Sequence, residues 1–200
     1  MHTLSNEIIL GSQSPRRKEI FGFFSVPFRQ VSPDFDELSV MFGGDPASYA
    51  IEIAKQKALS LVSQFPNHTI LTADTVVFRN GTLYLKPETL DEAMKMLREL
   101  SGKEHQVYTG VVVASRGKVF SDAELTRVFF SELTDPQLRT YVNTFQPLDK
   151  AGGYAIQKGG SLIVKRIEGC YYNVMGLPLH TVRRLMLNAG VDLWDFLKHT

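Results

Sequence analysis

The sequence predicts a single α/β domain spanning residues 1–200, because strand-like and helix-like segments alternate along the chain. Two patterns support this prediction. Short runs of apolar and β-branched residues are typical of buried strands, whereas apolar residues at intervals of three and four are typical of helices with one buried face. A chain of 200 residues can also bury roughly 70% of its unfolded surface, so it needs neither a disulfide nor a structural metal to fold.

The composition excludes several classes of protein. A net charge of +1 gives no basic excess of the kind that nucleic-acid partners select. Cys170 is the single cysteine, so the chain has no internal disulfide and no cysteine-based metal cluster. The first residues lack the pattern of a signal peptide, and no apolar segment approaches the roughly 20 residues that span a bilayer. We therefore expect a cytoplasmic protein that binds neither nucleic acid nor membrane.

The first strand, predicted at 8–10, leads into a helix whose start carries positive charge. Ser14 suits the N-cap position, and Pro15 suits the first helical position, where its missing N–H costs nothing. Arg16, Arg17 and the next residue are all basic, which is unfavourable at a helix N-terminus unless an anion binds there. We favour a phosphate site formed by free backbone N–H groups and the two arginines. The alternative is a set of solvated cations.

An acidic segment follows the second predicted strand, at 26–32. It contains Asp34, Asp36 and Glu37. Such a cluster is usually a solvated loop, but it could also supply a ligand to Mg²⁺, which takes one or two carboxylates together with phosphate oxygens. Both interpretations remain open at this point.

The next helix begins at Asp45 and Pro46 and ends near Gln64. Its apolar residues recur at helical spacing and predict one buried face. Lys57 lies along the edge of that face. A lysine in such a place either extends its ammonium to water or points it at a ligand above the sheet.

A carboxylate interrupts the apolar strand predicted at 69–78. A charge inside a buried strand is costly unless it is paired, bound to metal or open to a polar cleft. Asp74 is therefore either a structural acid or a functional one, and the strand alone does not decide between them. Asn80-Gly81 predicts a hairpin turn, so the returning strand could place Lys86 close to Asp74. The alternative is an ordinary lysine at the end of a strand.

The rest of the chain continues the alternation. Thr89 and Glu92 form a capping-box pattern at the start of a helix. The polar, glycine-containing segment 146–157 is suited to close approach of a ligand, and the amide of Gln157 is suited to reading the edge of a base. The remaining strands are predicted at 82–85, 105–114, 119–130 and 161–167, and the remaining helices at 90–100, 135–145 and 178–189.

Several of these segments, taken together and in order, resemble the Maf family of nucleoside triphosphate pyrophosphatases. Each segment alone is a weak signal, but the ordered set extends from residue 8 to about residue 185 and is specific. The matching segments are Ser12-Gln13-Ser14-Pro15-Arg16-Arg17, Phe35-Asp36-Glu37, Lys57-Ala58, Ala73-Asp74-Thr75, Lys86-Pro87, Leu100-Ser101-Gly102, Leu148-Asp149-Lys150-Ala151-Gly152, Ile156-Gln157 and Gly176-Leu177-Pro178-Leu179.

The resemblance implies roles for individual residues. Asp74 stands where the family has its proton acceptor. Arg16, Thr75 and Gln157 stand at positions that determine substrate specificity, and all three agree with the branch that resembles dTTP/UTP pyrophosphatases. The branch acting on 7-methyl-GTP typically has Trp, Gln and Glu at these positions.

The resemblance also implies a fold and a reaction. The expected fold is an elongated mixed β-sheet flanked by helices, with two lobes around a cleft, as in inosine triphosphate pyrophosphatases. The expected reaction converts dTTP or UTP, or a modified pyrimidine nucleotide, to the monophosphate and pyrophosphate, and so removes nucleotides from the cellular pool. The expected phosphate ligands are Ser12, Arg16, Arg17, Lys57 and Lys86, and the expected ligands of a divalent cation, Mg²⁺ or Mn²⁺, are Glu37 and Asp74.

Two alternatives remain beside this interpretation. One is a 7-methyl-GTP pyrophosphatase. The other is a nucleotide-binding regulator of cell division that does not turn over its ligand. The family resemblance permits a homodimer but does not require one.

Overall fold

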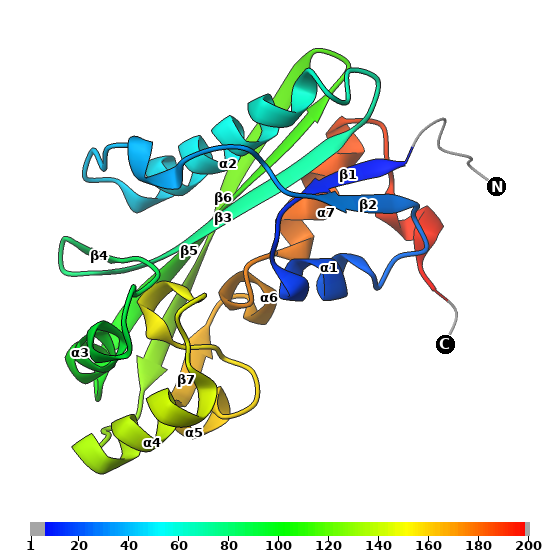
Figure 1. Cartoon of the computed structure of the whole chain (residues 1–200). Helices are drawn as coiled ribbons and strands as arrows, with labels where there is room; N and C mark the ends of the chain where they lie inside the picture. Colours follow the sequence, from blue (N-terminus) through cyan, green and yellow to red (C-terminus); the bar gives the residue numbers. More distant parts are fainter. Residues whose placement is uncertain (1–6, 199–200) are drawn as a thin grey trace.

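The protein is built on one seven-stranded mixed sheet, as shown by a computed structural model that describes residues 7–198 (Figure 1). The strands follow the order β2-β1-β3-β5-β6-β7, and β4 pairs with β3 outside this path. Their bounds are β1 Ile8–Gly11, β2 Phe28–Val31, β3 Ile70–Arg79, β4 Thr82–Tyr84, β5 Glu104–Ser115, β6 Lys118–Phe130 and β7 Val164–Glu168. This arrangement confirms the α/β class and the mixed sheet expected from the sequence.

The direction of the strands changes at β3. Strand β1 is parallel to both of its neighbours, β2 and β3. Strand β3 is antiparallel to β5, and the antiparallel pairing continues through β6 to β7. Strand β4 returns from β3 as a hairpin, in which Asn80 and Gly81 both have positive φ, as the sequence predicts.

Helices cover both ends of the sheet. Helix α2 lies along β3 and β5, α1 and α7 lie near β1, and α3, α4 and α5 lie at the opposite end (Figure 1). The helices are α1 Pro15–Phe21, α2 Pro46–Val62, α3 Leu90–Leu100, α4 Asp135–Phe145, α5 Gly160–Ile163, α6 Tyr171–Val174 and α7 Leu179–Asn188, with 3₁₀ turns η1 Glu37–Ser39, η2 Ala151–Gly153 and η3 Leu193–Phe196. No helix within residues 7–198 combines the length and the hydropathy that a membrane span requires.

The apolar interior has one large cluster at each end of the sheet, consistent with the elongated, two-lobed shape, and two smaller clusters that join α2 to the sheet. One large cluster joins β1 and α1 to α7, and β3 contributes Leu71 and Ala73 to it. Another joins α3 to α4, and β3 contributes Val77. Asp74 and Thr75 therefore lie on β3 where it passes from one lobe to the other.

The helix starts expected from the sequence are confirmed with one difference. The side chain of Ser14 accepts the N–H of Arg17, and the side chain of Thr89 accepts the N–H of Glu92. The Glu92 carboxylate, however, accepts from the N–H of Glu88, one residue before the cap. The helix is therefore capped as predicted, but the return half of the capping box is displaced by one residue.

The prediction for the C-terminal third was partly wrong. The strand expected at 161–167 begins as helix α5 and becomes extended only at Val164. The physical reason is Gly160, where an added Cβ would lie 1.8 Å from the carbonyl oxygen of Ala155, so the chain is tightly coiled here. The loop expected at 168–176 contains the short helix α6.

Candidate active site

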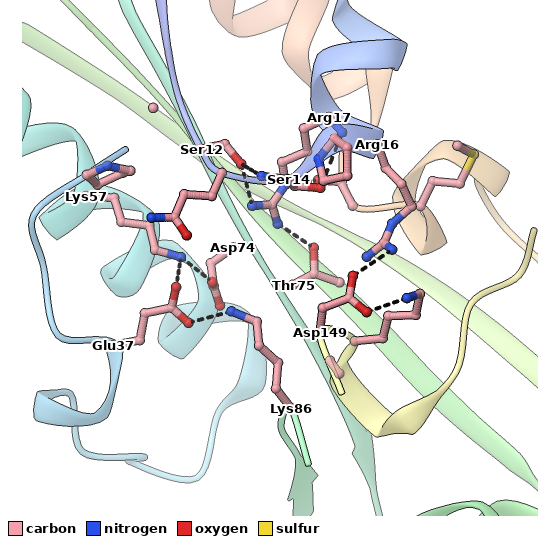
Figure 2. A pocket seen from close by; sticks show the side chains of 18 of the residues that line it. Ser12, Ser14, Arg16, Arg17, Glu37, Lys57, Asp74, Thr75, Lys86 and Asp149 are labelled. Atoms are coloured by element: carbon pink, nitrogen blue, oxygen red, sulfur yellow. Dashed lines mark hydrogen bonds and ion pairs between the residues drawn. The ribbon is translucent and has the colours of Figure 1, made fainter. Parts of the chain in front are cut away.

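A cavity of about 410 Å³ opens beside the middle of β3. On this side of β3, the pairing with β1 ends at Thr72 and the pairing with β4 begins at Val77. The edge of β3 between these points is therefore open among the described strands. Polar residues that line the cavity include Ser12, Ser14, Arg16, Arg17, Glu37, Lys57, Asp74, Thr75, Lys86, Asp149 and Lys150 (Figure 2).

The cavity receives side chains from both faces of the sheet because successive residues of a strand point to opposite faces. Asp74 points toward α2, where it meets Lys57. Thr75 points to the other face, where it meets Arg17 of α1. The open edge of β3 lets both faces reach one hollow.

Lys57 joins two carboxylates. Its Nζ lies 2.7 Å from Asp74 Oδ1 and 2.7 Å from Glu37 Oε1. Lys57 and Asp74 are each only 6% exposed, so the ion pair replaces the hydration that both charges lose. Lys86 reaches the same group from the β3–β4 hairpin, with its Nζ 3.2 Å from Glu37 Oε2. The expectation that the hairpin places Lys86 near Asp74 is confirmed, since both side chains line the cavity and Lys86 is linked to Asp74 through Glu37 and Lys57 (Figure 2).

The charged form of Glu37 is strongly favoured over its protonated form. Burial alone would raise the pKa of this carboxyl, but the charges and hydrogen bonds of Lys57 and Lys86 outweigh burial and lower the pKa to about 2. The turn that holds Glu37 is fixed by Asp36, whose side chain accepts the N–H of Leu38. In this acidic segment, Asp34 and Asp36 are exposed, and Glu37 is the acid that lines the cavity.

Arg17 ties together three parts of the cavity wall. Its Nε donates to the carbonyl oxygen of Gly176 at 2.7 Å, its Nη2 to Thr75 Oγ1 at 3.1 Å, and its Nη1 to Ser12 Oγ at 3.4 Å. Burial lowers the pKa of the guanidinium, and the nearby charge of Asp74 opposes that effect. Arg17 is thus held by the protein itself, while it still borders the cavity.

Arg16 crosses the cavity to a different segment. Its Nη1 lies 3.5 Å from Asp149 Oδ2, and Asp149 also pairs with the neighbouring Lys150. The sequence interpretation assigned no role to Asp149 or Lys150, although an acid–base pair shortly before the two glycines Gly152 and Gly153 was a visible signal. Gly152 has a φ of +70°, and an added Cβ would lie 3.1 Å from Val77, so the loop is pressed onto β3.

The similarity of this chain to known proteins identifies its family. The family model described as "Maf-like protein" matches residues 7–189. The chain belongs to the Maf family. The resemblance expected from the sequence is therefore confirmed over nearly the whole chain.

Curated members of the Maf family are similar to this chain over almost their full length. A dTTP/UTP pyrophosphatase from Chlamydia caviae is 47% identical, covering 96% of this chain and 98% of that protein. A dTTP/UTP pyrophosphatase from Pyrococcus furiosus is 45% identical, covering 90% and 94%. A nucleoside triphosphate pyrophosphatase from Chlamydia muridarum is 44% identical, covering 97% and 100%.

Two solved structures are much less similar in sequence to this chain, at 12–13% identity. The structure of the Staphylococcus aureus Ham1 protein aligns with a TM-score of 0.44 at 13% identity, covering 62% of this chain and 72% of that one. A dITP/XTP pyrophosphatase from Mycobacterium abscessus aligns with a TM-score of 0.42 at 12% identity, covering 64% and 76%. The description of the fold rests on the sheet and helices themselves.

One of the three residues expected from the sequence to determine substrate specificity does not line the cavity. Arg16 and Thr75 line it, but Gln157 does not. Gln157 is half-buried after η2, and its carbonyl oxygen accepts the N–H of Gly160. A contact between Gln157 and a base stays a prediction.

The Maf cavity fits a divalent cation only in company with a phosphate ligand. Within residues 7–198, no group of three or more His, Cys, Asp or Glu side chains could hold a metal by itself. Glu37 and Asp74 nevertheless converge on one point, because both lie 2.7 Å from the same Nζ. Two carboxylates suffice for Mg²⁺ when phosphate oxygens and waters complete its six ligands.

Proposed function

We propose that this protein is a nucleoside triphosphate pyrophosphatase that hydrolyses dTTP and UTP to the monophosphate and pyrophosphate. The observation that carries the proposal is the Lys57 ammonium shared by Asp74 and Glu37 inside a cavity lined by further cations. The names of curated relatives at 45–47% identity support the same activity and the same pyrimidine substrates.

The cations would hold the triphosphate. Lys57 and Lys86 approach the cavity from one side, and Arg16 approaches from the other (Figure 2). Ser12 adds a hydroxyl at the turn after β1, and Arg17 supports that wall through its bond to Ser12. Positioning of the phosphates and neutralisation of their charge provide most of the catalysis in phosphoryl transfer.

Asp74 would act as the general base. Its carboxylate takes a proton from a water molecule, and the water oxygen forms a bond to the α-phosphorus. The bond between the α-phosphorus and the oxygen that bridges to the β-phosphorus breaks, and pyrophosphate leaves with the electron pair of that bond. A buried carboxylate that lines the cavity is a suitable acceptor for this proton.

Glu37 and Asp74 are the residues that would hold a divalent cation, Mg²⁺ or Mn²⁺. A bound cation would supply charge neutralisation for the phosphate oxygens and the pyrophosphate that leaves. The Lys57 ammonium pairs with both carboxylates. When the nucleotide binds, this ammonium would interact with the phosphates instead.

A substrate panel tests the proposal. Pyrophosphate release is measured for dTTP, UTP, CTP and 7-methyl-GTP, each with Mg²⁺, with Mn²⁺ and with EDTA. Turnover of dTTP and UTP that requires a divalent cation is the expected result. Preference for 7-methyl-GTP would contradict the pyrimidine assignment, and tight dTTP binding without monophosphate production would contradict the enzymatic one.

We further infer that the protein acts in the cytoplasm on the free nucleotide pool, and that it can form a homodimer, as the family resemblance permits. Light scattering after size exclusion measures its mass against the 22.5 kDa of one chain. A single-chain mass at working concentration would contradict the dimer.

A further inference from the structure

The carboxylate of Asp149 holds one cation on each of its two oxygens. Arg16 Nη1 lies 3.5 Å from Oδ2, and Lys150 Nζ donates to Oδ1. All three side chains line the cavity (Figure 2). Arg16 belongs to α1, whereas Asp149 and Lys150 belong to the segment between α4 and η2. The contact therefore joins two parts of the cavity wall that come from opposite lobes of the molecule.

The two cations are mostly covered, and the acid between them is not. The exposed fraction of the side chain is 17% for Lys150 and 24% for Arg16, but 60% for Asp149. The backbone at Lys150 is anchored, because its N–H donates to the carbonyl oxygen of Pro147 and its own carbonyl oxygen accepts the N–H of Gly153. Arg16 lies in the first turn of α1. Both cations are thus built into the wall, whereas the Asp149 side chain is free to turn into solvent.

The contact between Asp149 and its two cations can be exchanged for another. Burial alone would raise the pKa of Asp149, but the hydrogen bond and charge of Lys150, together with the charge of Arg16, outweigh burial and lower the pKa. The carboxylate is therefore charged at neutral pH. An ion pair with an exposed partner contributes little, because water screens it. A phosphate group has more acceptor oxygens than a carboxylate and forms charge-assisted hydrogen bonds with arginine and lysine, so it can replace Asp149 as their partner.

Two groups of cations face each other across the cavity. Lys57 and Lys86 gather around a carboxylate on the side of α2. Arg16 and Lys150 gather around Asp149 on the other side (Figure 2). A chain of phosphates carries negative charge along its whole length, so cations at two positions match it better than cations at one. The pair on the far side from α2 supplies the second position.

The place between Arg16 and Lys150 is suited to an anion, because both donors are cations and a carboxylate already lies there. In a nucleoside triphosphate the negative charge is on the phosphate groups. The ribose hydroxyls and the bases of dTTP, UTP and CTP are uncharged near neutral pH. The phosphate chain is therefore the part of the substrate that matches this place.

We propose that Lys150 is a substrate-binding residue that holds a phosphate group together with Arg16, and that Asp149 is a resident anion that this phosphate displaces. The proposal rests on the proposed pyrophosphatase function and deepens it. Asp149 keeps the two cations together when no nucleotide is bound, and it competes with the nucleotide for them. Removal of its charge therefore strengthens phosphate binding, whereas removal of the charge of Lys150 weakens it.

The first test measures dissociation constants by calorimetry with Mg²⁺ present. One probe is inorganic tripolyphosphate, and the other is a UTP analogue in which a methylene group replaces the oxygen between the α- and β-phosphorus and prevents hydrolysis. Lys150→Gln is expected to weaken both complexes about ten-fold or more, the value of a hydrogen bond from a charged donor. Asp149→Asn is expected to tighten both roughly two- to five-fold, the value of an exposed ion pair that no longer has to be broken.

Two control variants accompany these substitutions. Lys95→Gln removes an exposed lysine from α3, outside the residues that line the cavity. Asp34→Asn removes an exposed acid whose two chain neighbours, Pro33 and Phe35, do line the cavity. Both controls are expected to keep the wild-type dissociation constants. Equal tightening by Asp34→Asn and Asp149→Asn would overturn the proposal, because any nearby negative charge would then have the same effect.

Three other outcomes would also overturn the proposal. Weaker binding of tripolyphosphate by Asp149→Asn would mean that the acid is needed to hold the cations in place. Weaker binding of the UTP analogue alone would mean that Asp149 contacts the ribose or the base. Tripolyphosphate that binds equally well to wild type and Lys150→Gln, or that does not bind to wild type, would remove the phosphate role of Lys150.

The second test uses turnover and inhibition. The KM for UTP is expected to rise about ten-fold in Lys150→Gln and to fall in Asp149→Asn, and inhibition by tripolyphosphate is expected to change in the same direction. An unchanged KM in Lys150→Gln would overturn the proposal while leaving pyrophosphate release intact. Failure of the proposed function has a different signature, which is that wild-type protein releases no pyrophosphate from dTTP or UTP, whereas tripolyphosphate binding still responds to both substitutions.

Discussion

Asp74 and Gly110 face each other directly across the β3–β5 pair. An added Cβ on Gly110 would lie 2.4 Å from the backbone carbon of Ala50 and 2.4 Å from the backbone nitrogen of Ile51. The backbone of α2 therefore rests on the sheet at this glycine. Lys57 lies seven residues further along α2, about two turns, and from there it reaches Asp74.

The substitution Gly110→Ala is expected to force α2 away from the sheet and to lower both stability and activity. Overpacking of this kind costs typically about 1–3 kcal/mol, and backbone atoms cannot move aside as a flexible side chain can. Urea unfolding and pyrophosphate release measure the two effects. Gly43→Ala is the matched control, because an added Cβ there meets nothing within 4 Å. Equal stability of the two variants would contradict the close contact.

The substitution Asp74→Asn tests the general base. The side chain keeps its shape, and its oxygen can still accept from Lys57, so the variant is expected to fold. Loss of a general base typically lowers the rate by about a hundred-fold or more. Pyrophosphate release and thermal unfolding are measured together. Asp135→Asn serves as control, since Asp135 is exposed and pairs with Arg98 away from the cavity. Near-normal turnover by Asp74→Asn would refute the role.

The substitution Lys57→Met is expected to destabilise the fold, because Asp74 then loses its cation in a buried site. Breaking a buried ion pair by removal of one partner costs about 3–5 kcal/mol. The free energy of unfolding is measured in urea, with Lys55→Met as the control, because Lys55 is exposed on the same helix. If the two variants lose the same stability, the ion pair contributes nothing measurable.

The burial of His105 predicts that the folded protein loses stability in mild acid. It is buried against Phe130 and Tyr154, with Nε2 2.7 Å from the Tyr154 hydroxyl. Burial, together with the charge of Arg79, lowers its pKa from 6.5 to about 3. Between these values the unfolded chain binds a proton that the folded protein does not. Stability therefore decreases as pH falls below about 6.5, by at most about 1.4 kcal/mol per pH unit.

Urea unfolding at about pH 7 and about pH 5 measures this slope above the range where most carboxylates titrate. His105→Gln is expected to flatten the slope, because the amide does not titrate and can still bond to Tyr154. His180→Gln removes an exposed histidine and is expected to leave the slope as it is. A slope that is the same in all three proteins would contradict the buried, neutral state of His105.

The sequence predicts those parts of the fold that depend on neighbouring residues. Ser14 and Thr89 cap their helices, and Asn80-Gly81 turns the hairpin, because each of these acts within a few residues of its own position. Helix α5 could not be predicted in this way. Its last two residues, Leu162 and Ile163, run into the apolar start of β7 and so look like part of a strand, and the coiling at Gly160 depends on contact with Ala155 in the preceding turn.

The residues of the candidate site also differ in whether neighbouring sequence predicts them. Asp74 and Arg16 stand out in the sequence because their charge is unusual for a strand and for a helix start. The burial of Lys57 depends on how closely α2 approaches Gly110, which is a contact between distant residues and leaves no trace near Lys57 itself. The same is true of Thr109, whose hydroxyl meets that of Thr75 only because β5 pairs with β3 in this register.

The floor of the cavity lies on an unbroken strand pairing at the centre of the sheet. Strand β3 is hydrogen-bonded to β5 from Ile70 to Phe78 without a break, and Asp74 and Thr75 are in the middle of that run. Amide protons of such a pair exchange with solvent only when the central sheet separates, which requires global unfolding. The chemistry is thus placed on a central strand of the sheet, and heat or denaturant is expected to abolish activity and fold in one step.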